Sequence, residues 1–243
     1  MKRLLPIHLF ANFRNAYYIL QLKQAVCAVV VLLVSTGSFS QSTAPSKDAA
    51  YLQTITQRSN KIVAVLGIAD SSKFYRVQNI MVQQYNSLNS LHETFNTNAK
   101  TIKKDSTLDK KTISEKVMGI EEKRTALLVD LHKNYLQKLA TELNGDQITK
   151  VKDGMTYNKV AVTYNAYVAM IPALTEEQKA KIHGYLVEAR EIAMDAESAD
   201  KKTEWFGKYK GRINNYLSTQ GYDVKKEGEQ WQERIKAAKA SNQ

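Results

Sequence analysis

The sequence predicts an all-α fold: a single helical domain in which a long helical hairpin is followed by shorter packed helices. From Tyr51 onward the 243-residue chain contains one proline, Pro172, and nine glycines. Apolar residues recur in this part at steps of three, four or seven, which is the spacing of amphipathic helices. Strand-like alternation is almost absent. We therefore expect helices along nearly all of it.

Two long amphipathic helices are expected to form the hairpin. The apolar stripe of the first contains Val77, Met81, Leu88, Leu91 and Phe95, and that of the second contains Ile113, Val117, Ile120, Leu127 and Leu131. The segment between them, Lys100 to Asp109, is charged and polar. We expect this segment to form an exposed turn.

Two later helices begin with the same pattern, Leu143-Asn144-Gly145-Asp146-Gln147 and Leu174-Thr175-Glu176-Glu177-Gln178. In both, the Asn or Thr side chain can accept an early helix N–H, while Gln reaches back to the N–H of the cap residue. The simpler interpretation is therefore a capping box. The pattern also resembles the Leu-Thr-x-x-Gln motif of small periplasmic stress chaperones, which are all-helical and carry it twice. A chaperone-like or structural protein thus stays open as an alternative.

The N-terminus has the order of a secretory signal peptide. Residues 1–24 contain four basic residues and no acid, residues 25–34 form an apolar run, and small polar residues follow. Ser38 and Ser40 fit the positions before a cleavage site, which places the mature start near Gln41. The apolar run is too short for a membrane span, which needs about 20 residues. The alternatives are an uncleaved anchor or a true start codon further along the chain.

This pattern divides the chain into a signal peptide (1–40), a flexible leader (41–49) and a helical domain (50–243), exported to the periplasm or beyond. The exported part keeps 31 Lys and Arg against 24 Asp and Glu, a net charge of +7. Its Lys and Glu alternate along the helices instead of gathering in a basic stripe, so no nucleic-acid partner is expected. No membrane span is expected in the mature chain, and the oligomeric state is left open.

Residue types that carry catalytic or metal chemistry are sparse. Cys27 is the only cysteine, and its removal with the signal peptide excludes disulfides and cysteine ligands in the exported chain. His92, His132 and His183 are scattered, with no metal-binding spacing, and no Gly-rich phosphate loop occurs. No cofactor and no metal are therefore predicted.

The segment VEAREIAMDAESAD places Glu188, Glu191, Asp195 and Glu197 near the end of the helix that begins at Glu176. Paired carboxylates could serve a glycosidase, one as general acid and the other as nucleophile or base. Acids on a helix that also carries Arg190 are more typical of a solvated face. A carbohydrate-active enzyme is therefore the least favoured alternative, and a non-catalytic role is preferred.

Aromatic and polar residues in two segments form the candidate ligand surface. Aromatic faces can pack on sugar rings, while Asn, Arg and Lys can bond to hydroxyls. The two segments are residues 154–167 and 205–223. In the second segment, Gly207 and Gly211 lie together on the side of the helix opposite the aromatic residues, and we expect them to allow close approach by another helix or a ligand. The candidate binding residues are Tyr157, Tyr164, Tyr167, Trp205, Tyr209, Lys210, Arg212, Asn214 and Asn215. The alternative is that the aromatic residues form the buried face of a helix.

Five stretches occur in a fixed order: KDGMTY at 152–157, MIPALTEEQKAKI, VEAREIAMDA, WFGKYKGRINNYL and GYD. Together they resemble a family of exported bacterial proteins of unknown function that are catalogued as candidate sugar-binding proteins. The likeness covers about residues 50–233. At one position the family has Gly, in Ala-Met-Asp-Ala-Gly-Ser, where this chain has Glu197, so the helix end there is uncertain from sequence. The resemblance implies export and binding of a saccharide or polysaccharide fragment, without a reaction or established site residues.

Overall fold

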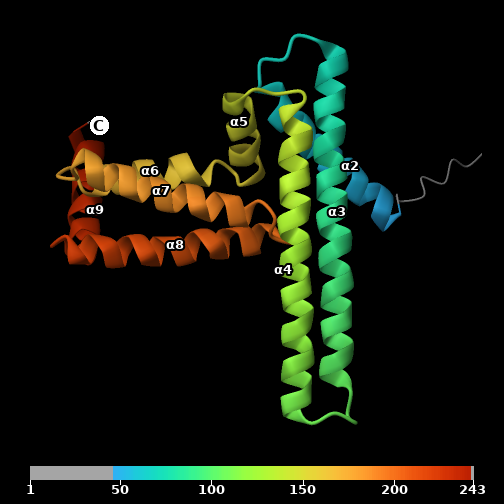
Figure 1. Cartoon of the computed structure of the whole chain (residues 1–243). Coiled ribbons are helices and arrows are strands. Elements are labelled where there is room, and N and C mark those ends of the chain that lie inside the picture. The colour runs from blue at the N-terminus through green and yellow to red at the C-terminus, as the bar shows by residue number, and fades with distance from the viewer. Residues whose placement is uncertain (1–45, 242–243) are drawn as a thin grey trace, which may run out of the picture. The chain divides into compact units, whose positions relative to one another are not determined.

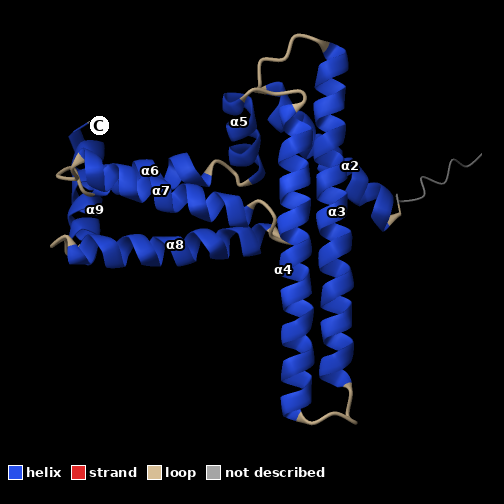
Figure 2. Ribbon diagram, viewed as in Figure 1, coloured by secondary structure: helices blue, strands red, loops and turns tan. Residues whose placement is uncertain are grey.

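The described part of the chain, residues 46–241 of a computed structural model, contains eight α-helices and no strand (Figures 1 and 2). The helices are α2 (Lys47–Ala64), α3 (Ser71–Lys104), α4 (Lys110–Ala140), α5 (Gly145–Met155), α6 (Lys159–Met170), α7 (Glu176–Ala193), α8 (Ala199–Thr219) and α9 (Val224–Ser241). All of them belong to one compact unit that begins at Lys47. The all-α prediction is therefore confirmed. The expected signal peptide lies outside the described residues, as does most of the leader, and α2 begins at Lys47 rather than at residue 50.

Helices α3 and α4 form the predicted hairpin and run side by side (Figure 1). The turn between them is shorter than expected, because α3 continues through Lys104. The Asp109 side chain begins α4 by accepting the backbone N–H of Thr112 at 2.7 Å. The expectation of a turn over the whole of Lys100 to Asp109 was thus wrong for residues 100–104, whose polarity reflects a mostly exposed helix face.

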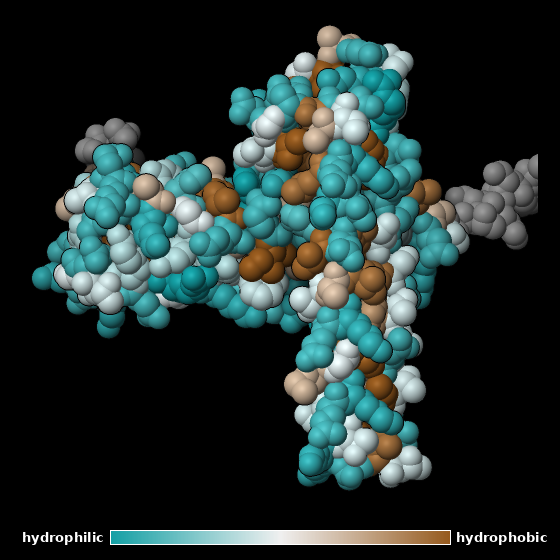
Figure 3. All heavy atoms as spheres, in the orientation of Figure 1, coloured by the Kyte–Doolittle hydropathy of each residue, from teal (hydrophilic) through white to brown (hydrophobic). Residues whose placement is uncertain are grey.

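One hydrophobic core lies where α2 and α5 pack on the hairpin. Its largest fully buried side chains include Ile55, Met81, Tyr135, Leu139 and Met155. In the first part of α4, the apolar stripe that faces α3 is only partly buried, because Tyr135 and Leu139, near the end of α4, are the buried residues of that helix. Leu127, one of the residues of the predicted stripe, is 48% exposed. Figure 3 shows hydrophobic residues in a line along the hairpin, with hydrophilic residues on either side.

A second core joins α6, α7 and α8. Its fully buried members include Ile171, Ile182, Leu186, Ile213 and Leu217. This core contains the apolar stripe of α7 from Ile182 to Ala193 and the inner face of α8. Other side chains at the end of α7 face the groove described below.

Local signals in the sequence fix where several helices begin and end. Asn144 with Gln147, at the start of α5, forms a complete capping box, and so does Thr175 with Gln178 at the start of α7. Gly221 follows the end of α8 with a φ of 88°, a left-handed conformation that glycine adopts without strain. The capping interpretation is therefore confirmed at both sites.

A buried lysine connects α8 to the ends of two other helices. Lys202, 4% exposed, donates through Nζ to the backbone oxygens of Met194 at 2.9 Å and Met155 at 3.2 Å. These oxygens lie at the C-terminal ends of α7 and α5, where the last carbonyls lack helical partners and carry partial negative charge. Burial lowers the pKa of Lys202 to about 8.

Candidate functional site

A groove of about 710 Å³ lies in the described part of the chain. It is bounded by α3 and α4 on one side and by the end of α7, the following turn and the start of α8 on the other. Its volume falls in the range of small-molecule binding sites, roughly 300–1,000 Å³. The groove is therefore large enough for a small ligand.

His132 on α4 holds two carboxylates at the floor of the groove. Its Nδ1 lies 2.6 Å from Oδ2 of Asp195, and its Nε2 lies 3.6 Å from Oε2 of Glu191. The hydrogen bond with Asp195, together with that with Glu191, raises the pKa of His132 to about 9. At neutral pH the imidazole is thus positively charged and sits between two anions.

Glu191 is itself held by three cationic side chains. Besides His132, Lys152 on α5 contacts it at 2.7 Å and Arg190 contacts it at 3.0 Å. Burial opposes its ionisation, but the hydrogen bonds and charges of these groups outweigh that effect and lower the pKa of Glu191 to about 2. Arg190 also binds Asp153 at 2.8 Å. The network therefore ties α4, α5 and α7 together through ion pairs.

His92 on α3 contacts the same turn from the opposite helix of the hairpin. Its Nε2 lies 2.7 Å from the backbone oxygen of Asp195. His92 and Asp195 are 7% and 9% exposed, and Nδ1 of the histidine and Oδ1 of the aspartate have no hydrogen-bond partner among the described residues. The turn after α7 is thus joined to both hairpin helices.

The prediction that the acidic residues at the end of α7 form a solvated face was wrong for Glu191 and Asp195. Asp195 is buried, Glu191 is half-buried, and Arg190, taken as a sign of a solvated face, is 6% exposed. It was correct for Glu188, which is exposed and pairs with Arg212 at 3.2 Å. The helix wheel could not reveal this difference, because the partners of Glu191 and Asp195 come from α3, α4 and α5.

Trp205 forms the aromatic part of the groove wall. It is half-buried near the start of α8, and Nζ of Lys208 lies 4.1 Å from the centre of its ring. Leu128, Val129 and Ile192 add aliphatic surface to the same groove. Val129 is 62% exposed and Ile192 is 39% exposed. The groove thus combines an aromatic plate with exposed aliphatic surface.

The formal charges that line the groove are balanced. The basic members are Arg124, His132, Lys201 and Lys208, and the acidic members are Glu191, Asp195, Glu197 and Glu204. Several of them pair locally: Lys201 binds Glu204 at 2.9 Å, and Glu197 accepts from Asn96 at 2.7 Å. With four groups of each sign, the groove favours a ligand without net charge.

Glu197, the position where this chain differs from the family motif, does not disturb the helix end. Helix α7 stops at Ala193, before that residue is reached.

The remaining candidate residues of α8 lie outside the groove. Tyr209 is 8% exposed and belongs to the second core, while Arg212 lies 4.7 Å over its ring. Lys210 and Asn215 are exposed, and Asn214 accepts a hydrogen bond from Tyr167. Of the candidate residues in this segment, the structure therefore brings only Trp205 to the cavity.

The three tyrosines of the other candidate segment are not gathered with Trp205. Tyr157 is 42% exposed in the turn between α5 and α6, and Tyr164 packs edge-on against His183 at 5.6 Å. Tyr167 is buried and donates to Oδ1 of Asn214 at 2.7 Å. The expected second aromatic wall therefore does not line the groove.

Gly207 and Gly211 do not serve close packing of another described helix, so that part of the expectation was wrong, whereas close approach by a ligand stays a prediction. A Cβ atom at either position would meet nothing within 4 Å. The close approach occurs instead at Gly154 of α5, where a Cβ atom would lie 2.8 Å from Cγ1 of Ile62 on α2. This contact leaves no local pattern in the sequence, because Ile62 and Gly154 belong to separate helices.

The groove presents ionised and hydrogen-bonding side chains. Glu191 is held as a carboxylate at neutral pH, whereas a general acid requires a raised pKa. Within residues 46–241, no group of three or more His, Cys, Asp or Glu side chains is arranged to hold a metal ion. None of the helices in that range is both long and apolar enough to cross a membrane.

Comparison with known families identifies the family of the chain. No curated protein was found to match the sequence. Residues 52–237 match a family model described as a protein of unknown function, DUF3826. This match covers nearly all of the described helices, from α2 into α9. The chain therefore belongs to the DUF3826 family of proteins of unknown function.

Proposed function

We propose that the protein is an exported, non-catalytic binding protein whose groove takes an uncharged saccharide. The observation that carries the proposal is the half-buried Trp205, which lines a cavity of about 710 Å³ together with exposed aliphatic and polar side chains. A sugar ring offers one C–H face and a rim of hydroxyls, which such a wall can contact simultaneously.

The balance of charge along the groove supports the choice of a neutral sugar. A strongly anionic or cationic ligand would face as many like charges as opposite ones. Lys208 does not block the indole, because it is exposed and a cation–π contact at an exposed site is worth about 0.5–1 kcal/mol. A sugar ring can therefore replace the lysine on the indole at small cost.

The ion network beneath the groove supports a binding role as well. It fixes the end of α7 against α4 and α5 through His132, Glu191 and Lys152. A site whose walls are already positioned loses less entropy when a ligand binds.

A glycan array probed with the purified protein tests the proposal, followed by fluorescence titration of each glycan found. The chain has two tryptophans, Trp205 and Trp231. Trp231→Phe leaves Trp205 as the only tryptophan, and its emission should shift when the glycan binds. Trp205→Ala should weaken binding at least about tenfold, the loss expected when an aromatic contact worth about 1.4 kcal/mol is removed. Unchanged affinity in Trp205→Ala would place the saccharide site elsewhere.

A further inference from the structure

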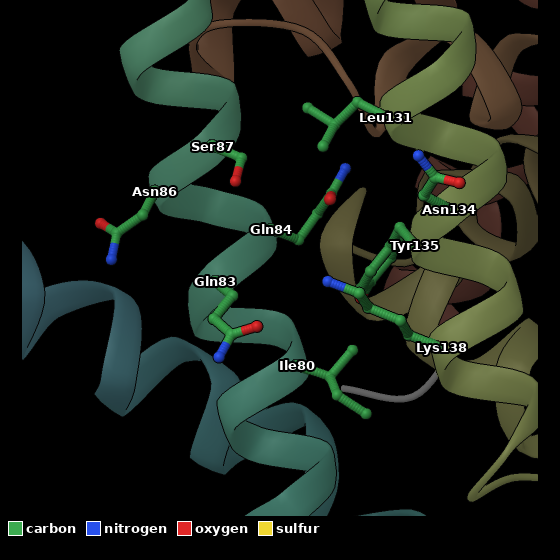
Figure 4. Close-up of a pocket in the computed structure, with 9 residues that line it drawn as sticks. All are labelled: Ile80, Gln83, Gln84, Asn86, Ser87, Leu131, Asn134, Tyr135 and Lys138. Carbon is green, nitrogen blue, oxygen red and sulfur yellow. The ribbon is translucent and has the colours of Figure 1, made fainter.

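A second cavity, of about 350 Å³, lies between α3 and α4 (Figure 4). It shares no lining residue with the groove that contains Trp205. Its size is at the lower end of the range of small-molecule sites. A ligand of this cavity would therefore be small and would bind independently of the groove.

Uncharged polar side chains supply most of the hydrogen-bonding capacity of this cavity. Gln83, Gln84 and Ser87 come from α3, and Asn134 comes from α4. No side-chain hydrogen bond joins any of the four to another described residue. Amides and hydroxyls both donate and accept, which matches the hydroxyl groups of a sugar.

Gln84 is the strongest sign that the cavity is a site. The residue is 4% exposed, and its Nε2 is buried without a partner in the described part of the chain. Its side chain extends from α3 toward α4, into the space between the helices (Figure 4). A buried amide donor without a partner is unfavourable, so its retention here indicates an acceptor that the protein alone does not supply.

Lys138 gives the cavity its charge. The exposed lysine extends from α4 toward α3 (Figure 4), and the lining of the cavity contains no Asp or Glu. Ile80 and Leu131 add an apolar wall. The cavity thus carries one positive charge beside several neutral donors and acceptors.

The geometry points to a separate binding site for a single acidic sugar, a polyhydroxy monocarboxylate, in the cavity between α3 and α4. The carboxylate pairs with Lys138, and the hydroxyls bond to the amides of Gln83, Gln84 and Asn134. The C–H face of the ring packs on Ile80 and Leu131. The ligand acceptor satisfies Nε2 of Gln84.

Nuclear magnetic resonance of the side-chain amide groups tests this site with glucuronate as the probe. Glucose, which has the hydroxyls without the charge, and acetate, which has the charge without the hydroxyls, are the two comparison ligands. Glucuronate should shift the Gln84 amide signals and bind more tightly than either. Gln84→Met and Lys138→Met should each weaken glucuronate binding by about tenfold, as expected for loss of a charged or buried hydrogen bond.

Asn89→Ala is the matched control, because Asn89 is an exposed amide on α3 outside the cavity lining. Its affinity for glucuronate should be unchanged. Gln83→Met, at an exposed lining position, provides a second test should Gln84→Met fold poorly. If glucuronate leaves the Gln84 signals in place, or if both glutamine variants bind it as the parent protein does, Gln84 holds only a buried water and the proposal fails. Trp205→Ala should retain this binding, so failure of one site does not affect the other.

Discussion

Trp205 and Phe206 are neighbours in the sequence but lie in different environments. Phe206 is 2% exposed in the core of α6, α7 and α8, whereas Trp205 is half-buried on the groove. Adjacent helical positions point about 100° apart, so one side chain can fill a core while the next lines a surface. The sequence alone could not distinguish these roles, since both residues are large and aromatic.

This difference predicts unequal costs of truncation. Phe206→Ala should lower the free energy of unfolding by about 3–5 kcal/mol, the range for a buried aromatic residue. Trp205→Ala should cost less than about 3 kcal/mol, because part of the indole already contacts solvent. Urea denaturation of the two variants measures both values. A loss for Trp205→Ala equal to that for Phe206→Ala would make Trp205 a core residue.

The raised pKa of His132 predicts a pH-dependent stability. Its pKa is about 9 in the folded protein and 6.5 in the reference state. The folded state therefore holds a proton that the unfolded state releases, so the stabilisation is complete below pH 6.5 and is lost as pH rises through 9. Between pH 6.5 and 8 the free energy of unfolding should fall by up to about 2 kcal/mol.

Urea denaturation at several pH values checks this expectation. His132→Asn should flatten the decline, whereas His183→Asn, at an exposed histidine, should keep it. The range ends at pH 8 because Lys202 acts in the opposite direction above it: its folded pKa of about 8 lies below its reference value of 10.5. A parent profile without a decline below pH 8 would show that His132 is not protonated in the folded protein.

At the scale of helices, packing between α2 and α5 depends on one glycine and packing around α8 does not. A Cβ atom at Gly154 would press on the stiff, branched side chain of Ile62, whereas one at Gly211 would meet nothing. Gly154→Ala should therefore destabilise the protein by about 1–3 kcal/mol. Gly211→Ala should stabilise it by about 0.5–1 kcal/mol, because alanine favours a helix interior. Thermal or urea denaturation of the pair measures both signs, and a destabilising Gly211→Ala would reveal a contact at that face.

The helices themselves were largely predictable, whereas the site was not. Apolar spacing and capping residues act within a few positions of each other, so the hairpin, both capping boxes and the glycine after α8 could be derived from the sequence. The pairing of His132 with Asp195 joins residues 63 positions apart and leaves no local pattern. In the sequence, Gln84 is indistinguishable from the other polar residues of a long helix. Its burial between α3 and α4 is visible only in the structure.

At the scale of the whole chain, the proposal includes export from the cytoplasm. We propose that residues 1–40 direct export and are then removed, because they have the basic, apolar and small-residue order of a signal peptide. In a Gram-negative host the protein should lose about 4 kDa, from roughly 40 residues of about 110 Da each. Mass spectrometry of the fractionated cells measures this loss. Cytoplasmic protein that retains Met1 would contradict the proposal.

Lys202 has a consequence for chemical probing of the domain. Its amine is enclosed by the ends of α5 and α7, while that of its neighbour Lys201 is half exposed on the groove. An acylating reagent should therefore modify Lys201 in the native protein and reach Lys202 only when α8 separates from those two helix ends. The two adjacent amines form a built-in reporter pair: the ratio of their labelling measures how often this junction opens, without any engineered probe.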